Sequence, residues 1–314
     1  MRKKTVHAAL FGLAIGDALG VPVEFKKREE LKGRKVKDYE GYQTHNQPPG
    51  TFSDDSSLTF CLAESLCHGY DLNDMGQRFV KWFFEGYWTA GGEVFGVGKS
   101  TEDSIARLRD GVSPLQSGNY ADDCYGNGSL MRILPLLFYI RDKDVEERYR
   151  IIREVAVITH GSTRTILACF YYLEFALELL KGSEKMMALL RTQHTVYNCI
   201  KGKNIPPEEM EIAEVLIRGK MFMKGVNSIV TIHHAHLTIE AAVFCLLRTN
   251  SYEEAVLMAV NLGDDTDTTA SVTGALAGLY YGFESIPEKW IHGIRRSNDI
   301  NDLCDRFAAA MKIN

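Results

Sequence analysis

The apolar residues of this chain recur at three- and four-residue steps, and this period limits the fold more than any other feature of the sequence. In residues 57–68 the apolar positions include 58, 61, 62 and 66. The same period is found in residues 163–180, 208–218, 238–248 and 253–260. Such spacing is typical of helices with one buried face. Convincing strand alternation and a strand–helix–strand rhythm are absent, so the sequence predicts an all-α fold and argues against a doubly wound sheet.

Composition places the chain among ordinary globular proteins. Of its 314 residues, 45% are hydrophobic and 25% are charged, which argues against disorder. The 36 basic and 41 acidic residues give a net charge of −5, so neither a nucleic-acid footprint nor a polybasic membrane signal is present. Because no segment has the composition of a linker, we expect a single domain over residues 1–314.

The N-terminus and the cysteines bear on the cellular compartment. The first residues are basic, as in a signal peptide, but Gly12, Gly16 and Asp17 interrupt the apolar stretch that follows. We therefore expect the first helix of a mature protein there, and no apolar run approaches the ~20 residues of a membrane helix. The seven cysteines form no CxxC pair. An odd count in a chain of this length predicts free thiols and a cytoplasmic setting.

Glycines recur every fourth residue in two segments, at positions 12, 16 and 20 and at positions 274, 278 and 282. A glycine inside a helix costs about 1 kcal/mol relative to alanine, so its repeated use calls for a packing reason. The interpretation that we favour is a smooth stripe that lets two helices approach closely in the core.

Two acidic clusters each precede a predicted helix. The candidate oxygen ligands in them are Ser53, Asp54, Asp55, Asp265, Asp267 and Thr268. Either cluster alone is explained by helix capping. However, several carboxylates in one turn repel each other unless a cation neutralises them. Carboxylates mixed with hydroxyls suit Mg²⁺, Mn²⁺ or Ca²⁺ rather than zinc, so the pattern leaves helix caps and a metal centre as alternatives.

Two further segments are weaker candidates. Residues 126–129 read Gly-Asn-Gly-Ser before an apolar stretch, and a glycine-rich helix start exposes N–H groups that bind anions. A plain turn has the same sequence pattern. Glu24 follows a glycine-rich helix end, where it is either a cleft acid or a solvated loop acid.

Two other patterns are set aside. Residues 96–101 end in Gly-Lys-Ser-Thr like a P-loop, but Glu93 stands where the first glycine is needed and no apolar strand precedes it. The histidines at 233, 234 and 236 suggest zinc, yet no cysteine or acid follows at ligand spacing. We interpret these histidines as surface or core-edge residues.

Taken together, five segments in order resemble the ADP-ribosylglycohydrolase family. They are residues 12–20 with Glu24, 50–55, 126–132, 159–161 and 261–268. The resemblance implies a compact orthogonal multi-helix bundle with a metal-binding cleft that holds two Mg²⁺ or Mn²⁺ ions. It implies that the metal ligands are Ser53, Asp54, Asp55, Asp265, Asp267 and Thr268. The implied catalytic residues are Asp54, Asp55 and Glu24, and the implied substrate contacts are Gly126, Asn127, Gly128, Ser129 and His160.

The activity implied by the resemblance is metal-dependent hydrolysis of the C1″ bond between ADP-ribose and a protein or small-molecule acceptor. The partner would be an ADP-ribosylated protein or conjugate, and neither a membrane nor nucleic acid is expected. Gly96, Ser162 and Asp264 depart from the family pattern, and the acceptor stays open. The alternatives are a binding protein that holds ADP-ribose or a nucleotide without cleaving it, and a hydrolase of a free nucleotide conjugate on the same fold.

Overall fold

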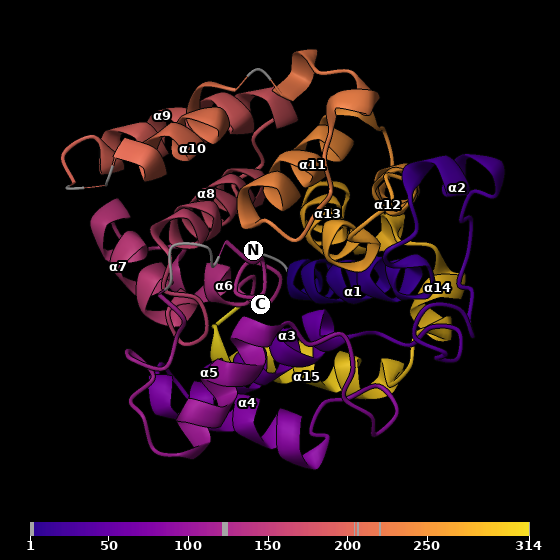
Figure 1. Ribbon diagram of the computed structural model, residues 1–314, viewed down its shortest axis with the longest axis horizontal. Coiled ribbons are helices and arrows are strands. Elements are labelled where there is room, and N and C mark those ends of the chain that lie inside the picture. Colours follow the sequence, from indigo (N-terminus) through magenta and orange to yellow (C-terminus); the bar gives the residue numbers. More distant parts are fainter. Residues whose placement is uncertain (1–2, 121–124, 204, 206, 220, 314) are drawn as a thin grey trace.

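Helices α1 (Lys4–Gly20) and α13 (Thr266–Tyr281) pack against each other in the core of the computed structural model, which describes residues 3–120, 125–203, 205, 207–219 and 221–313 (Figure 1). A Cβ atom on Gly16 would lie 2.1 Å from the carbonyl oxygen of Ala270, and one on Gly278 would lie 2.0 Å from that of Ala8. The two helices therefore run antiparallel with their backbones in contact. The predicted glycine stripe is confirmed for both helices, whereas Gly282 follows the end of α13 with φ +88°.

The described residues form fifteen α-helices and no β-strand, which confirms the all-α prediction. The other helices are α2 (Arg28–Gly33), α3 (Asp54–Leu66), α4 (Leu72–Glu85), α5 (Lys99–Arg109), α6 (Leu136–Ile140), α7 (Val145–Ala156), α8 (Thr163–Leu180), α9 (Lys185–Ile200), α10 (Pro207–Arg218), α11 (Ala235–Arg248), α12 (Tyr252–Val260), α14 (Glu288–Gly293) and α15 (Ser297–Ala310). Short 3₁₀ turns are η1 (Val21–Val23), η2 (Met221–Met223), η3 (Val226–Ser228) and η4 (Phe283–Ser285).

The outer helices follow from their sequence patterns. In α4, Met75, Phe79 and Trp82 are buried at three- and four-residue steps. The Asp71 side chain accepts hydrogen bonds from the first turn, and Gly86 ends the helix with φ +71°. In Figure 1, α3, α4, α5 and α15 lie below α1, and α8 to α12 lie above it. The central pair is thus covered by helices on both sides.

Helix α1 with η1 has the length and hydropathy of a membrane-spanning helix. The candidate span Lys4–Val23 has a mean hydropathy of 1.6, and its most apolar window is completely buried among the other helices. An apolar helix that is buried on every side is what the core of a large helical protein requires. Six cysteines have free thiols, and Cys124 lies outside the described residues.

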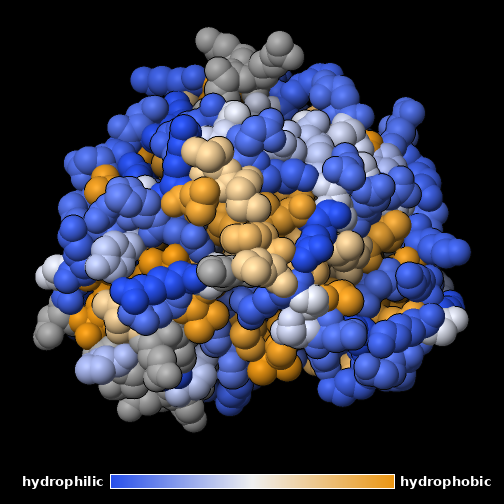
Figure 2. All heavy atoms as spheres, turned by 90° about the horizontal axis from the view of Figure 1, so that it is seen from above, coloured by the Kyte–Doolittle hydropathy of each residue, from blue (hydrophilic) through white to orange (hydrophobic). Residues whose placement is uncertain are grey.

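Apolar side chains also reach the surface away from the core. Figure 2 looks onto the side where α9 and α10 lie in Figure 1 and shows apolar atoms gathered near the middle of that face. The large apolar residues of these two helices that are exposed are Met186, Met187, Leu190, Tyr197 and Val215. None of them lines the cleft described below.

Candidate active site

A polar cleft of about 440 Å³ lies where the N-terminal turns of three helices meet. The beginnings of α3, α5 and α13 supply Asp54, Asp55, Lys99, Ser100, Thr101, Asp267 and Thr268. The remaining lining residues come from loops and turns: Glu24, Phe25, Gly96, Val97, Gly98, Gly126, Asn127, Gly128, Met131, His160, His233 and His234. Residues that are far apart in the sequence therefore share one concave surface, which is the usual setting of a catalytic site.

The α3 side of the cleft is held by the buried carboxylate of Asp17. This side chain accepts hydrogen bonds from the backbone N–H of Ser53 at 3.0 Å and from the backbone N–H and hydroxyl of Ser56. Ser53 caps the helix, because its Oγ accepts from the N–H of Asp55 at 3.2 Å. Sequence reasoning assigned no role to Asp17. Its side chain orients the turn that presents Asp54 and Asp55 to the cleft.

The α13 side is held by contacts to Asp265. Its Oδ2 accepts a hydrogen bond from the Asn127 side-chain amide at 2.6 Å and lies 3.2 Å from Nδ1 of His233. Asn127 also donates to the Thr238 hydroxyl at 3.0 Å. Nδ2 of Asn127 is therefore bonded to two protein groups, and one of these hydrogen bonds positions a candidate metal ligand.

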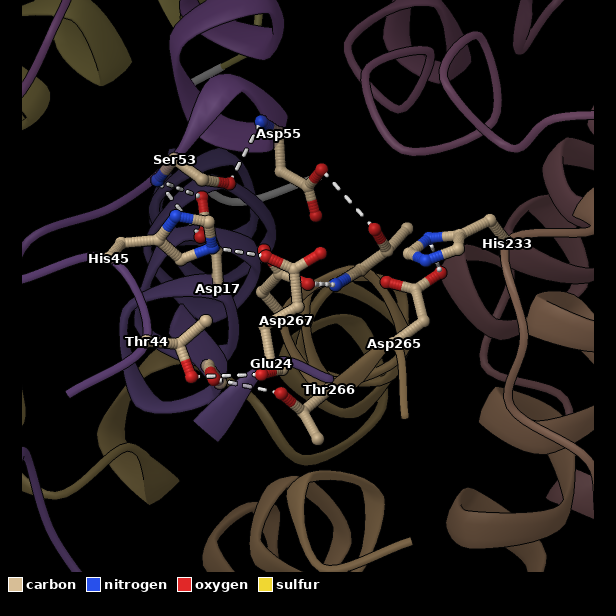
Figure 3. A network of polar contacts seen from close by, with 12 residues as sticks. Asp17, Glu24, Thr44, His45, Ser53, Asp55, His233, Asp265, Thr266 and Asp267 are labelled. Carbon is tan, nitrogen blue, oxygen red and sulfur yellow. Dashed lines mark hydrogen bonds and ion pairs between the residues drawn. The ribbon is translucent and has the colours of Figure 1, made fainter. Parts of the chain in front are cut away.

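The two acidic clusters face each other across the cleft. The Thr268 hydroxyl lies 3.5 Å from Oδ1 of Asp55. Figure 3 shows Asp55, Asp265 and Asp267 around a common space, with His45 and His233 on either side of it. Four of the six predicted ligands line the cleft, whereas Ser53 and Asp265 are buried directly behind it. The sequence pattern alone left helix caps and a metal centre as alternatives, and the family resemblance implied one shared cleft. The fold brings the two clusters together.

The chemistry of these groups fits hard divalent cations. Oδ2 of Asp55 and Oδ1 of Asp265 are buried and have no hydrogen-bond partner among the described residues. A buried carboxylate oxygen without a partner is costly unless a cation or a proton satisfies it. The described residues also bring Glu24, His233 and Asp265 together, with one ligand atom of each within 4.8 Å of the others. This second group was not predicted, because His233 was read as a surface or core-edge residue.

Burial and mutual repulsion change the acidity of the cluster. Burial, followed by the charges of neighbouring acids, raises the pKa of Asp54, Asp55 and Asp267 well above the ordinary range. Burial also raises the pKa of Asp17 to about 6, against the opposing effect of its hydrogen bonds. The hydrogen bond with Asp265 raises the pKa of His233 to about 9. The cluster thus favours bound protons or cations.

These shifts predict how the stability of the metal-free protein depends on pH. In the unfolded chain the Asp residues release their protons near pH 3.9 and His near 6.5. The folded protein keeps these protons to higher pH, so the free energy of unfolding falls as pH rises. For Asp17 this stabilisation is complete below about pH 4 and is lost as pH rises through about 6. For His233 it is lost between about 6.5 and 9.

Burial lowers the pKa of His160 to about 3 and that of His236 to about 4, so these two groups favour the folded state at higher pH. The raised pKa values of Asp17, His233 and the three cluster carboxyls outweigh them. We therefore expect a higher melting temperature at pH 5 than at pH 8 when the protein is held in EDTA. Mg²⁺ should reduce this difference, because a cation replaces the protons on the carboxylates. Differential scanning calorimetry at both pH values, with EDTA or Mg²⁺, measures the effect. A melting temperature that rises from pH 5 to pH 8 in EDTA would contradict the electrostatic account.

Glu24 is held in the cleft by a histidine that sequence reasoning missed. Oε2 of Glu24 lies 2.5 Å from Nε2 of His45, and the Glu24 carbonyl accepts from the Thr44 hydroxyl at 2.9 Å. Glu24 is buried and lines the cleft, so it is not a solvated loop acid. Phe25 follows it with φ +68° and a half-exposed ring at the cleft. A bulky residue with positive φ is strained, and such strain is common at functional sites.

Of the two interpretations of segment 126–129, a helix start and a plain turn, the structure has the turn. The segment forms a bridge and turns, and the next helix, α6, begins only at Leu136. Two glycines and the downstream Pro135, which has no N–H, weaken helix formation here. The backbone N–H of Asn127 donates to the His233 carbonyl at 3.1 Å. Ser129 is fully buried beside Cys169 and is absent from the cleft lining, so of this segment Gly126, Asn127 and Gly128 reach the cleft.

His160 lies directly behind these glycines. A Cβ atom on Gly126 would lie 3.1 Å from Nε2 of His160, and one on Gly128 would lie 2.7 Å from its Cε1. Both positions therefore exclude a side chain without movement of the ring. The predicted substrate contact His160 reaches the cleft because Gly126 and Gly128 leave room for it.

The two segments that sequence reasoning set aside also line the cleft. Residues 98–101 open α5, and within the described part of the chain no strand precedes them, so a P-loop remains excluded. His233 and His234 line the cleft next to 126–127. No local signal distinguished these residues, because their place at the cleft depends on segments distant in the sequence.

The departures from the family pattern have structural explanations. Gly96 has φ +80°, and a Cβ there would lie 2.8 Å from Oδ1 of Asp54, so a larger residue would crowd the acidic cluster. The carboxylate of Asp264 forms an ion pair with Lys27 at 2.5 Å. Ser162 caps α8 by accepting from the N–H of Thr165 at 3.4 Å.

Comparison with known proteins gives one consistent result. The family model described as ADP-ribosylglycohydrolase matches residues 1–314. A solved structure titled "ADP-ribosylglycohydrolase-related protein complex" superposes with a TM-score of 0.81 at 28% identity, over 99% of each chain. These matches confirm the family resemblance inferred from the five segments.

The curated relatives have related activities in their names. "ADP-ribosylarginine hydrolase Tri1" of Serratia proteamaculans is 28% identical over 95% of this chain and 77% of its own length. "ADP-ribosylhydrolase ARH3" of Danio rerio is 27% identical over 96% of this chain and 89% of its own. "ADP-ribosyl-[dinitrogen reductase] glycohydrolase" of Rhodospirillum rubrum is 25% identical, and the match covers 90% of this chain and 87% of its own length.

Proposed function

The chain belongs to the ADP-ribosylglycohydrolase family, and from that premise we propose that its cleft hydrolyses the C1″ glycosidic bond between ADP-ribose and a protein arginine. It is an enzyme, an ADP-ribosyl glycohydrolase. The observation that carries the proposal is the convergence of Asp54, Asp55, Asp267 and Thr268 with Glu24 on one cleft. Paired carboxylates flanking a cleft are what glycoside hydrolysis requires.

We propose that two Mg²⁺ ions, or Mn²⁺ in their place, bind at this cluster. The residues that would hold them are Ser53, Asp54, Asp55, Asp265, Asp267 and Thr268. Support comes from Oδ2 of Asp55 and Oδ1 of Asp265, which find no hydrogen-bond partner within the described ranges, and from the raised pKa of three carboxyls of the cluster. When bound, such ions would bind the vicinal hydroxyls of the distal ribose, lower the pKa of a bound water and stabilise the charge that develops in the transition state.

The protein groups account for the proton transfers. In the proposed reaction the oxygen of water forms a bond to C1″ while the bond from C1″ to the arginine nitrogen breaks. Asp55 or Asp54 accepts the proton of the attacking water, and Glu24 donates a proton to the leaving nitrogen. His45 fixes Oε2 of Glu24 by its 2.5 Å contact. Asp17 and Asn127 act indirectly, because they orient the two acidic turns.

An aromatic ring at the cleft favours arginine as the acceptor. A guanidinium is planar and cationic, and it stacks on aromatic faces. The ring of Phe25 at the cleft provides a face for cation–π stacking. Two relatives named ADP-ribosylarginine hydrolase, 28% and 29% identical over 95% of this chain, support the same choice.

We place the diphosphate of ADP-ribose at the opposite end of the cleft, against Gly126, Gly128 and His160. The glycines allow the ligand to approach the backbone closely. The first turn of α5, from Gly98 to Thr101, lines the same cleft, and the N-terminus of a helix attracts anions. The substrate would be an ADP-ribosylated protein in the cytoplasm, a compartment with which the free thiols agree.

Release of ADP-ribose, measured by mass spectrometry, tests the proposal. Arginine-linked, serine-linked and nucleic-acid-linked conjugates are each offered with Mg²⁺ and with EDTA. We expect Mg²⁺-dependent release from the arginine conjugate, and at least about tenfold slower release from the others. Preferential release from serine would overturn the acceptor assignment, and undiminished release in EDTA would overturn the metal dependence. Binding of ADP-ribose without release from any conjugate would favour a binding protein.

A further inference from the structure

Arg132 is a buried cation with few partners. Its side chain is fully buried, and its guanidinium lies 4.7 Å from the centre of the Phe79 ring. Nη2 donates to the Thr159 hydroxyl at 2.7 Å and lies 3.4 Å from the Val155 carbonyl. Nε and Nη1 have no hydrogen-bond partner among the described residues. A buried charge is costly, so its one short hydrogen bond points to a specific role.

That hydrogen bond determines the direction of the next one. A guanidinium can only donate, so the Thr159 oxygen accepts from Arg132, and the hydroxyl proton must go to another acceptor. In the described residues the remaining partner of this hydroxyl is Nδ1 of His160, at 2.9 Å. Thr159 therefore donates to Nδ1, which carries no proton. With the proton on Nδ1 of His160, the buried hydroxyl proton of Thr159 would have no acceptor. The population of that tautomer should therefore be lower by a factor of roughly ten or more.

The other nitrogen of the ring faces the cleft. Nε2 of His160 lies next to Gly126 and Gly128, and the described residues offer it no hydrogen-bond partner. Burial and the charge of Arg132 lower the pKa of His160 to about 3, so the ring is neutral at neutral pH. Arg132 stays charged there, although burial lowers its pKa to about 10. The neutral ring carries one proton, and the tautomer determines whether Nδ1 or Nε2 holds it.

We propose that Arg132 and Thr159 are positioning residues, which hold His160 as the Nε2–H tautomer so that it presents a fixed neutral donor to the diphosphate of the substrate. The identity of the ligand rests on the proposed function. The tautomer does not, because it follows from contacts within the protein. The buried cation also lies one side chain behind the donor, where it strengthens attraction of an anion.

The first experiment measures the tautomer directly. The protein is labelled with ¹⁵N-histidine, and the His160 signals are identified by their loss in His160→Gln. We expect a protonated Nε2 and an unprotonated Nδ1 whose resonance shows an accepted hydrogen bond. Thr159→Val keeps the shape of the side chain and removes the hydroxyl, so the hydrogen-bond shift of Nδ1 should disappear, and Thr159→Ser should restore it. A proton on Nδ1 in the unaltered protein would overturn the proposal without need of any variant.

The second experiment measures the consequence for the ligand. Calorimetric titration with ADP-ribose in Mg²⁺ should show a Kd about tenfold weaker in Thr159→Val and within about twofold of the original in Thr159→Ser. In turnover assays KM should rise more than kcat falls. Unchanged affinity in Thr159→Val would overturn the role of the tautomer in binding. If the unaltered protein binds no ADP-ribose, the proposed function and the assigned ligand fail, while the measured tautomer still decides the positioning claim.

Discussion

Replacement of Asp55 by asparagine is expected to lower kcat for release of ADP-ribose by about 10³-fold while the protein stays folded. Asp55 lies in the first turn of α3 and lines the cleft, and its Oδ2 has no hydrogen-bond partner in the part of the chain that the structure describes. It is thus placed both to bind a cation and to accept the proton of the attacking water. An amide has nearly the same shape but neither the charge nor the basicity. Turnover of the arginine conjugate at saturating substrate measures the loss.

The same substitution should make the metal-free protein more stable. Burial and the neighbouring carboxylates raise the pKa of Asp55, so its ionised form is disfavoured in the folded state. We expect the melting temperature of Asp55→Asn in EDTA to rise by a few degrees, and its increase on addition of Mg²⁺ to shrink. Asp142→Asn is the matched control, since the Asp142 side chain is exposed and paired with Arg141 outside the cleft. Activity close to normal in Asp55→Asn would contradict the assigned site.

Replacement of Gly16 by alanine is expected to destabilise the fold by about 3 kcal/mol or more. The new Cβ would lie 2.1 Å from the carbonyl oxygen of Ala270 and 3.0 Å from the N–H nitrogen of Ser271. Both atoms belong to the backbone of α13, so no side chain can rotate away. The two central helices would have to separate. Thermal or urea unfolding should show a melting temperature lower by about 6 °C or more.

Gly33→Ala is the control for this effect. Gly33 is exposed in α2, and a Cβ there meets nothing within 4 Å. The change should leave stability unaltered or raise it slightly, because alanine favours the helix. Equal melting temperatures for the Gly16 and Gly33 variants would show that the close approach of α1 and α13 is not needed for stability.

The contact between α1 and α13 also explains how the core positions the site. A Cβ on Gly20 would lie 2.3 Å from the Cα of Asp267, so the end of α1 touches the first turn of α13. Glu24 follows α1 after η1, and the Thr266 hydroxyl donates to the Gly20 carbonyl at 2.8 Å. Distances between the candidate acid and the opposing carboxylates are therefore set by helix packing rather than by flexible loops.

The sequence predicted the local features of this site correctly. Ser53 and Asp265 are the N-caps of α3 and α13, and the acids beside them lie in the first turns. Such features depend on a few consecutive residues, whose period and capping pattern are visible without a structure. For 126–129 the sequence left a helix start and a plain turn as alternatives, and the structure has turns there, since two glycines and Pro135 outweigh the apolar residues that follow.

The sequence by itself therefore determined the helical class, the glycine-lined contact and the two acidic turns, because each depends on the spacing of residues that are close together in the sequence. Only the tertiary structure decided that Asn127 and His233 hold Asp265, that His45 holds Glu24 and that Arg132 reaches His160 through Thr159. Asn127 and Asp265 are 138 positions apart. A hydrogen bond between such residues forms only when the core is packed. No pattern of neighbouring residues in the sequence therefore predicts it.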